Sequence, residues 1–392
     1  MACVTVVVAA ALAGYLPGGW HHGGRAAAGA AGAGAVARHD GSAARPEPLA
    51  TKPALMTGQP LPRAASVRLL LGGQQPAPAW LQVPSGRTEP IRGLPEYATS
   101  YQVWPIAGGW TAQLYPPGNA QCGNCAPPPL PVYYIADGSR AASRIGTATV
   151  TAPAAAPRAV WLVSYRTGAD MSTAAGTAQE VSVSGTALGP RFRLPIGYVI
   201  SQGTRAGLLL VQEQAPEGHF QYELWDPGTR RVTRSFMNVI AASATQVAWL
   251  PACAGSCQVH VLDLASGQAS EVSLPGRSTA GQGAFSPDGS LLALLLMAGG
   301  TAAGPATTNR LAVATLATGQ VTAVPGTTVG GDIGLAFGWQ PGSHQLIADV
   351  TVSGPGQPEW QIAVWEPGDA RLSTALTRTP DQSWPIIDQG PY

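Results

Sequence analysis

The chain has 392 residues, enough for one large domain or two ordinary ones. Charged residues make up 11% of the chain, well under the roughly 25% of an average soluble domain, and hydrophobic residues make up 45%. The net charge is +1 without a basic stripe, which argues against a protein that binds the phosphate backbone of nucleic acids. The 11 tryptophans can help to build a core and exclude a fully disordered chain.

Residues 4–16 (VTVVVAAALAGYL) form an unbroken apolar run. The run is shorter than the roughly 20 residues that a helix needs to cross a bilayer, and it fits the apolar core of a signal peptide. Ala11 and Ala13 provide a small-residue cleavage pattern, whereas no Arg or Lys precedes Arg25. We therefore predict that residues 1–16 are a signal peptide, or a membrane anchor truncated by a gene start set too late. A short buried helix is the alternative.

Residues 17–65 have the composition of a flexible tether. Ala and Gly make up nearly all of Gly23–Ala37, and prolines follow at positions 46, 48, 53, 60 and 62. Such stretches cannot bury enough surface to offset the entropy that ordering would cost. A tether after a hydrophobic start indicates that the remaining domain, residues 66–392, is held away from a membrane.

Along this domain one pattern recurs: an apolar strand, a polar turn that contains glycine, and a second strand. Glycine fits because such hairpin loops place one residue at positive φ, where a Cβ atom would clash. The turns lie 39 to 52 residues apart, and their glycines are Gly86, Gly138, Gly185, Gly228, Gly267, Gly319 and Gly368. A period of about 40–50 residues is typical of β-propellers, whose blades have four strands each.

The fold prediction is therefore an all-β chain that forms a β-propeller of seven four-stranded blades. A pair of β-sandwiches is the alternative, which the even spacing disfavours. The first unit, residues 67–95, provides only three strands, whereas Asp381–Gln389 is a terminal strand without a unit of its own. We expect this terminal strand to become the innermost strand of the first blade, because closing the ring removes open sheet edges.

One blade carries a distinctive turn. Phe285–Gly289 (FSPDG) precedes the apolar strand Leu291–Leu296, and an aspartate-containing hairpin occurs at Leu262–Gly267. This arrangement resembles the repeat of the TolB-like and WD40-like propellers of the bacterial envelope, and Trp225–Asp226 is similar to the WD dipeptide. The resemblance implies a propeller in an extracytoplasmic setting and transfers no catalytic residue. Its repeat-turn motif consists of Ser286, Pro287, Asp288 and Gly289.

Two pairs of cysteines lie between the second and third strands of their units: Cys122 with Cys125, and Cys253 with Cys257. A four-cysteine zinc site needs all sulfurs about 2.3 Å from one ion, whereas these pairs belong to the second and fifth blades, nearly opposite across the ring. A redox CxxC would need a strand followed by a helix. We favour two local disulfides in an oxidising compartment, with a redox pair, a metal site and free thiols as alternatives.

The other reactive side chains form no catalytic pattern. His219, His260 and His344 show no metal-ligand spacing, and each fits a hydrogen-bonded blade residue. Asp288 and Asp332 could face the channel, but turn aspartates usually bond to their own backbone. No catalytic, cofactor-binding or metal-binding residue is predicted. An aromatic cluster is expected to pack in the core, with a sugar-stacking platform as the alternative: Tyr97, Tyr101, Trp104 and Trp110.

These features favour a binding or scaffolding module over an enzyme. We expect an extracytoplasmic monomer that associates with the membrane through its N-terminus and binds another envelope protein, without a cofactor or nucleic acid. An enzyme of lyase, hydrolase or lactonase type that uses the central channel is one alternative, and a ligand-sensing ectodomain is another. Four loops between second and third strands should form the contact surface: Pro116–Leu130, Met171–Thr177, Met297–Asn309 and Ser353–Glu359.

Overall fold

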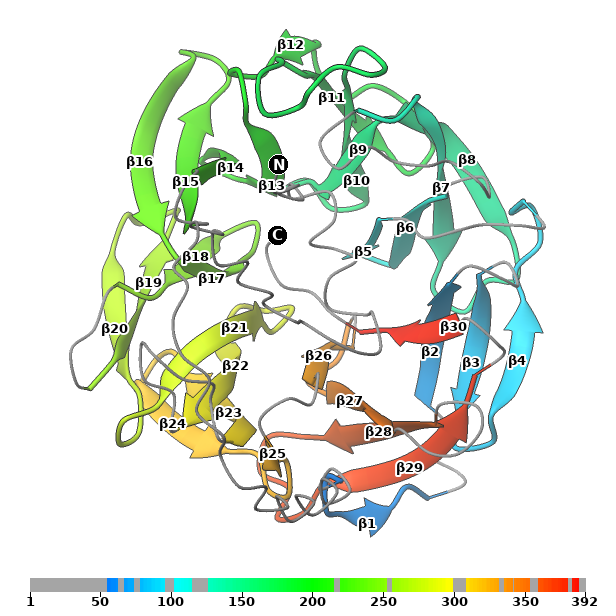
Figure 1. Ribbon diagram of the computed structural model, residues 1–392, viewed down its shortest axis with the longest axis vertical. Coiled ribbons are helices and arrows are strands. Elements are labelled where there is room, and N and C mark those ends of the chain that lie inside the picture. Colours follow the sequence, from blue (N-terminus) through cyan, green and yellow to red (C-terminus); the bar gives the residue numbers. More distant parts are fainter. Residues whose placement is uncertain are drawn as a thin grey trace, which may run out of the picture.

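The computed structural model shows seven sheets arranged as blades around a central channel (Figure 1). It describes residues 55–62, 67–73, 78–95, 102–114, 126–214, 219–251, 256–298, 308–330, 335–340, 342–352, 359–379 and 383–387. Every regular element in these ranges is a strand, and no helix there is long and apolar enough to cross a membrane. The prediction of a seven-bladed, all-β propeller is confirmed.

In each blade the strands run antiparallel, from the channel outward. Blades 1 to 4 contain β30 (Ser383–Ile386), β2 (Val67–Gly73), β3 (Ala79–Val83) and β4 (Arg87–Pro90); β5 (Val103–Ile106), β6 (Gly109–Gln113), β7 (Leu130–Ala136) and β8 (Ala142–Ala148); β9 (Val150–Pro153), β10 (Ala159–Ser164), β11 (Thr177–Ser182) and β12 (Phe192–Arg193); β13 (Val199–Thr204), β14 (Gly207–Gln214), β15 (His219–Asp226) and β16 (Arg231–Met237). Blades 5 to 7 contain β17 (Val239–Ala242), β18 (Gln246–Trp249), β19 (Gln258–Asp263) and β20 (Ala269–Ser273); β21 (Thr279–Phe285), β22 (Leu291–Ala298), β23 (Thr308–Thr315), β24 (Gln320–Ala323) and β25 (Val329–Gly330); β26 (Leu335–Trp339), β27 (Leu346–Val352), β28 (Glu359–Trp365), β29 (Ser373–Arg378) and β1 (Gln59–Pro60).

The C-terminal strand closes the ring. β30 is the innermost strand of blade 1 and pairs antiparallel with β2, from Leu70 opposite Ile386 to Gly73 opposite Ser383 (Figure 1). The strand is shorter than the predicted range of 381–389 but lies where the sequence places it. One blade is thus built from both ends of the propeller domain.

The outer hairpins follow the predicted turn chemistry at six of their seven glycines, which have φ between 68° and 102°. The exception is the hairpin of blade 4, where Gly228 is not at positive φ and Arg230 is, at 57°. Arg230 donates its backbone N–H to the carbonyl of Asp226, four residues back, just as Gly267 donates to Asp263 in blade 5. Arg230 therefore occupies the position that glycine has in the neighbouring blade, and the prediction that Gly228 is the turn glycine is wrong.

The core lies between the blades, because both faces of each sheet are covered by its neighbours. The apolar strand β22 shows this directly: Leu292 and Leu294 pack toward blade 5, whereas Ala293 packs toward blade 7. Two indoles also join adjacent blades through hydrogen bonds. The Nε1 atom of Trp80 donates to the carbonyl of Ser139 at 2.6 Å, and that of Trp339 donates to the carbonyl of Ala284 at 2.9 Å.

Residues 55–62, which we call the N-terminal strap, belong to the propeller and not to the tether predicted for 17–65. Within the strap, β1 pairs in parallel with β29 as a fifth strand of blade 7. Met56 is buried between blades 6 and 7, and Leu61 between blades 7 and 1. The side-chain amide of Gln361 bonds to both backbone groups of Met56 at 2.7 and 2.8 Å. Residues 1–54, including the predicted signal or anchor, lie outside the described residues.

Candidate functional site

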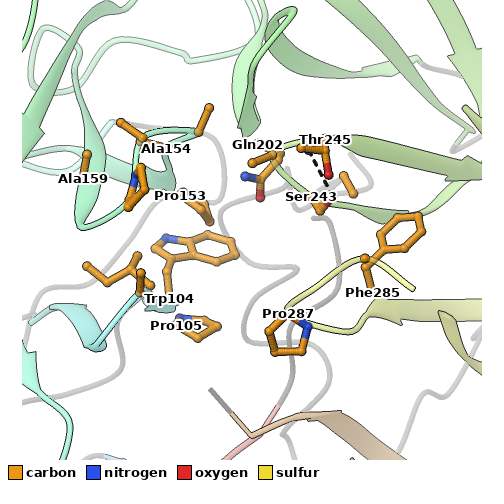
Figure 2. A pocket seen from close by; sticks show the side chains of 18 of the residues that line it. Trp104, Pro105, Pro153, Ala154, Ala159, Gln202, Ser243, Thr245, Phe285 and Pro287 are labelled. Carbon is orange, nitrogen blue, oxygen red and sulfur yellow. Dashed lines mark hydrogen bonds between the residues drawn. The ribbon is translucent and has the colours of Figure 1, made fainter. Parts of the chain in front are cut away.

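The channel opens into a cavity on the face where the first strand of each blade turns into the second (Figure 2). Its volume is about 570 Å³. The walls come from five successive blades, at the ends of β5, β9, β13, β17 and β21 and in the turns that follow them. We call this space the channel-mouth cavity. It exists only because the ring brings together turns that are separated by 40 to 50 residues of sequence.

Trp104 provides the one indole of the cavity. The residue is 6% exposed, and its Nε1 donates to the carbonyl and the hydroxyl of Thr151 at 3.0 and 3.1 Å. These bonds join blade 2 to blade 3 and hold the ring in place. Figure 2 shows the indole reaching into the space beside Pro153, with the side chain of Gln202 pointing toward it from the other side. The Nε2 of Gln202 donates to the carbonyl of Gly203 at 2.9 Å.

The wall from blade 3 is made of small and rigid residues. Ala154–Pro157 presents three alanines and a proline between β9 and β10, so the surface carries backbone groups and methyls. The turn is supported from behind by Glu180, whose carboxylate accepts a hydrogen bond from the backbone of Ala156. Burial raises the pKa of Glu180, and this hydrogen bond opposes the shift. The turn ends at Arg158, which has φ of 58° and lies with its guanidinium 5.7 Å from the ring centre of Tyr134.

The charged groups of the lining are two arginines and one aspartate. Arg205 is exposed in the turn of blade 4, and its backbone N–H is fixed by the carbonyl of Ala244 at 2.8 Å. Asp288 belongs to the repeat-turn motif of blade 6. Its carboxylate accepts bonds from the hydroxyls of Ser286 and Ser290 and from the backbone of Ser290, at 2.7 to 3.0 Å. These bonds lower its pKa to about 2. Asp288 therefore stays ionised at neutral pH and its oxygens are occupied by its own turn.

Hydroxyl groups in the lining serve two purposes. The Oγ of Ser243 accepts the backbone N–H groups of Thr245 and Gln246 at 3.2 and 3.0 Å and thereby shapes the turn of blade 5 (Figure 2). Ser201, on the innermost strand of blade 4, is 3% exposed, and its Oγ is buried without a hydrogen-bond partner. A buried hydroxyl of this kind costs stability until a partner reaches it. A ligand group that entered the cavity could supply that partner.

The repeat-turn motif is the one predicted set of residues that the structure brings to this cavity. Ser286, Pro287, Asp288 and Gly289 all line it. Asp332 lies outside the described residues. The motif thus has two roles: it folds the blade, and it forms part of the mouth. The rest of the lining could have been located once the hairpins were counted, because each innermost strand precedes its blade's apolar second strand.

The predicted aromatic cluster is divided by the structure. Trp104 faces the channel mouth, whereas Trp110 is buried in the core between blades 1 and 2. Tyr97 and Tyr101 lie outside the described residues. The expectation that the cluster packs together in the core is therefore wrong for Trp104, because β5 is the innermost strand of its blade and Trp104 lies near its channel end.

The histidines are far apart in the fold. His219 begins β15 and His260 lies in β19, where its Nδ1 is 3.7 Å from Oε1 of Glu271. The Nε2 of His344, in blade 7, is 3.5 Å from Oδ2 of Asp288. In the part of the chain that the structure describes, no group of three or more His, Cys, Asp and Glu residues could hold a metal ion.

The cysteines are described only in part. Cys257 is 5% exposed, packs in the core of blades 5 and 6, and is disulfide-bonded. Cys122, Cys125 and Cys253 lie outside the described residues. The pairing of Cys122 with Cys125 and of Cys253 with Cys257 therefore stays a prediction.

The four loops that we expected to form a contact surface do join second to third strands, in blades 2, 3, 6 and 7. Neighbouring strands are antiparallel, so these connections lie on the face opposite the channel-mouth cavity. Most of their residues lie outside the described ranges. The loop of blade 3 is an exception, and it is partly packed: Met171 is 2% exposed, and the carbonyl of Ala169 accepts the N–H of Ala126 at 2.8 Å.

Comparisons with known proteins extend this description at the level of the fold. No family model and no curated protein matches the chain. An acylaminoacyl peptidase structure is 10% identical, with a TM-score of 0.51, and the match covers 84% of this chain but only 53% of the peptidase. TolB from Acinetobacter baumannii is 14% identical, with a TM-score of 0.41 and coverage of 74% and 81%. The propeller of Dos1 is 11% identical, with a TM-score of 0.44 and coverage of 85% and 88%.

At these identities the likeness concerns the fold alone. The order of strands in the sheets and the closure by β30 establish the architecture independently. The chain is therefore a seven-bladed β-propeller, similar in fold to TolB and to the propellers of peptidases.

Proposed function

We propose that this protein is a binding module whose channel-mouth cavity holds a segment of a partner protein. The observation that carries the proposal is the cavity itself, an open space of about 570 Å³ that five blades line with small, rigid residues and one fixed indole. Concave sites of this size with a few convergent polar groups are the usual places where proteins bind ligands. A peptide segment suits the walls because they present backbone groups as well as apolar surface.

The lining favours a segment that places an apolar side chain beside an acidic one. The flat face of Trp104 offers a surface for an aliphatic, prolyl or aromatic group. Gln202 and the buried hydroxyl of Ser201 can bond to peptide groups. Arg205 can pair with a carboxylate, since Asp288, the only acidic group among the described lining residues, is occupied by its own turn.

The setting that we propose is outside the cytoplasm, with the propeller attached to the membrane through its N-terminus. The support is the apolar run of residues 4–16 and the Ala-, Gly- and Pro-rich sequence that follows. Protease added to intact cells of the native host should then degrade the protein. Degradation only after lysis of the inner membrane would contradict this location.

Selection of displayed random peptides on the full chain tests the binding site. We expect the enriched peptides to share an apolar residue next to Asp or Glu. Their affinity should fall about tenfold or more in Arg205→Glu, because a charge-assisted bond becomes a repulsion. Gln202→Ala should weaken binding of the same peptides to a smaller extent.

Arg234→Glu is the matched control, since Arg234 is exposed on the outer strand β16 and faces no part of the cavity. Its affinity for the peptides should equal that of the unaltered chain. If instead the affinity is lost when Met171–Thr177 is replaced by a short turn and is unchanged in Arg205→Glu, the contact surface lies on the opposite face and the channel-mouth proposal is wrong.

A further inference from the structure

A second recess lies on the face opposite the channel-mouth cavity, at the outer part of blade 6. Its volume is about 380 Å³. The residues around it come from three segments: the link between β20 and β21, the start of β23, and the link between β24 and β25. The function proposed above uses none of these residues.

The recess results from a break in the outer edge of blade 6. β24 pairs with β23 only as far as Ala323 opposite Ala312, and β25 resumes the pairing at Val329 opposite Asn309. Between these points the buried hydroxyl of Thr327 replaces a strand: it accepts the N–H of Leu311 at 3.0 Å and donates to the carbonyl of Val324 at 2.8 Å. Arg310 lies within this gap.

The charge of the recess is positive. Arg277 and Arg310 are its only charged residues, and guanidinium groups are always protonated. Neither makes an ion pair with any residue in the described part of the chain. Arg277 is exposed, whereas the Nε of Arg310 is shielded from solvent and has no hydrogen-bond partner. A buried donor on a cation is costly to leave unpaired, so the site is favourable for an anion.

Hydroxyl groups complete the set of donors. Ser278, Thr308 and Thr328 line the same recess from the three segments. Two guanidinium groups and three hydroxyls that approach from different sides suit an anion with several acceptor oxygens directed tetrahedrally. A carboxylate, with two oxygens in one plane, would leave part of this set unused.

We propose that this recess binds a phosphate group. The bond from Nε of Arg310 and the fork of Arg277 would supply most of the affinity, and the hydroxyls would orient the oxygens. The source of the phosphate group is either the free inorganic ion or a phosphate monoester, which the open side of the recess can admit.

Isothermal titration of the full chain at constant ionic strength tests this assignment, with inorganic phosphate and glycerol 3-phosphate as probes and acetate as the planar comparison. We expect saturable binding of at least one phosphate probe and much weaker binding of acetate. Arg310→Met and Arg277→Met should each reduce the phosphate affinity about tenfold or more, since each removes charge-assisted bonds. Arg277 is exposed, so its replacement leaves folding intact even if Arg310→Met does not.

Arg234→Met on the exposed strand β16 removes the same charge elsewhere and should leave the affinity unchanged. Tighter binding of inorganic phosphate would identify the free ion as the ligand, and tighter binding of glycerol 3-phosphate would identify a phosphorylated molecule. Absence of saturable binding for both probes, equal affinity for acetate, or an equal loss in Arg234→Met would overturn the proposal.

Discussion

Asp288 shows how one turn residue links local folding to the proposed binding site. Its bonds to Ser286 and Ser290 favour the ionised carboxylate, and His344 adds a weaker attraction at 3.5 Å. The pKa therefore falls from its usual value of 3.8 to about 2. A group whose pKa is lower in the folded state stabilises that state above the unfolded pKa and loses the contribution as the pH falls through the folded pKa.

We expect Asp288→Asn to lower the free energy of unfolding at pH 7 by about 1 kcal/mol, a value reduced for screening because the side chain is half exposed. The difference between the two proteins should shrink between about pH 4 and pH 2, as the native carboxylate becomes protonated. Urea unfolding at a series of pH values measures this. A difference that stays constant down to pH 2 would show that the carboxylate charge is not what stabilises the turn.

The cysteines give a second prediction at the residue scale. If Cys122–Cys125 and Cys253–Cys257 are disulfides within short loops, each should contribute only about 2 kcal/mol, because short loops lose little unfolded-state entropy. Their main effect would be resistance of the loops to proteolysis. Peptide mapping without reductant, on protein exported by its native host, should find both bridges. Four free thiols, or one zinc ion per chain, would reject this pairing.

At the scale of elements, the N-terminal strap depends on close backbone contact. Thr57 donates its N–H to the carbonyl of Gly326 at 2.8 Å, and Gly326 has φ of 74°. A Cβ atom at residue 326 would collide with the carbonyl oxygen of Thr57. Gly319 has a similar φ of 68°, but a Cβ atom there would meet its nearest neighbour at 3.5 Å. The two glycines therefore separate backbone strain from the strap contact.

We expect Gly326→Ala to lower the free energy of unfolding by about 2 kcal/mol more than Gly319→Ala, since only the former displaces the strap. Hydrogen exchange should report the displacement, because the amides of Gln59 and Leu61 donate to the carbonyls of Leu372 and Thr374. These two amides should exchange faster in Gly326→Ala and remain protected in Gly319→Ala. Equal protection in both variants would mean that the strap does not depend on this contact.

Elements differ in how far their sequence determines them. The outer hairpins could be predicted because each carries its own turn chemistry, and even in blade 4 the error moved the turn residue only from Gly228 to Arg230. β1 could not be predicted, since Gln59–Pro60 has no alternating pattern and its bonds are made to residues more than 300 positions away. The channel-mouth cavity was missed for the same reason: Trp104 reaches it only through the assembled ring.

At the scale of the whole molecule, the fold separates the two proposed sites. First-to-second turns lie on one face and second-to-third connections on the other, because neighbouring strands are antiparallel. The channel-mouth cavity is therefore on the opposite face from the recess of Arg277 and Arg310. A partner segment and a phosphate group would not compete for space.

The integrity of both faces depends on ring closure by β30. This strand contributes four backbone pairs to β2, and Ile387, which follows it, is buried between blades 7 and 1. Without it, blade 1 would expose the edge of β2 to the channel, and an exposed edge invites association. We expect a chain that ends at residue 380 to unfold roughly 5–10 °C below the full chain and to self-associate, since both hydrogen bonds and apolar burial are lost.

A chain that ends at Gln389 is the control for this truncation, because it retains β30 and loses only the last three residues. It should keep the midpoint of the full chain and remain monomeric by size-exclusion chromatography. A synthetic peptide of residues 381–389 should raise the midpoint of the truncated chain by pairing with β2, as the covalent strand does. If the chain that ends at residue 380 unfolds at the same temperature as the full chain, the seven blades hold together by their lateral packing, and β30 is not needed for closure.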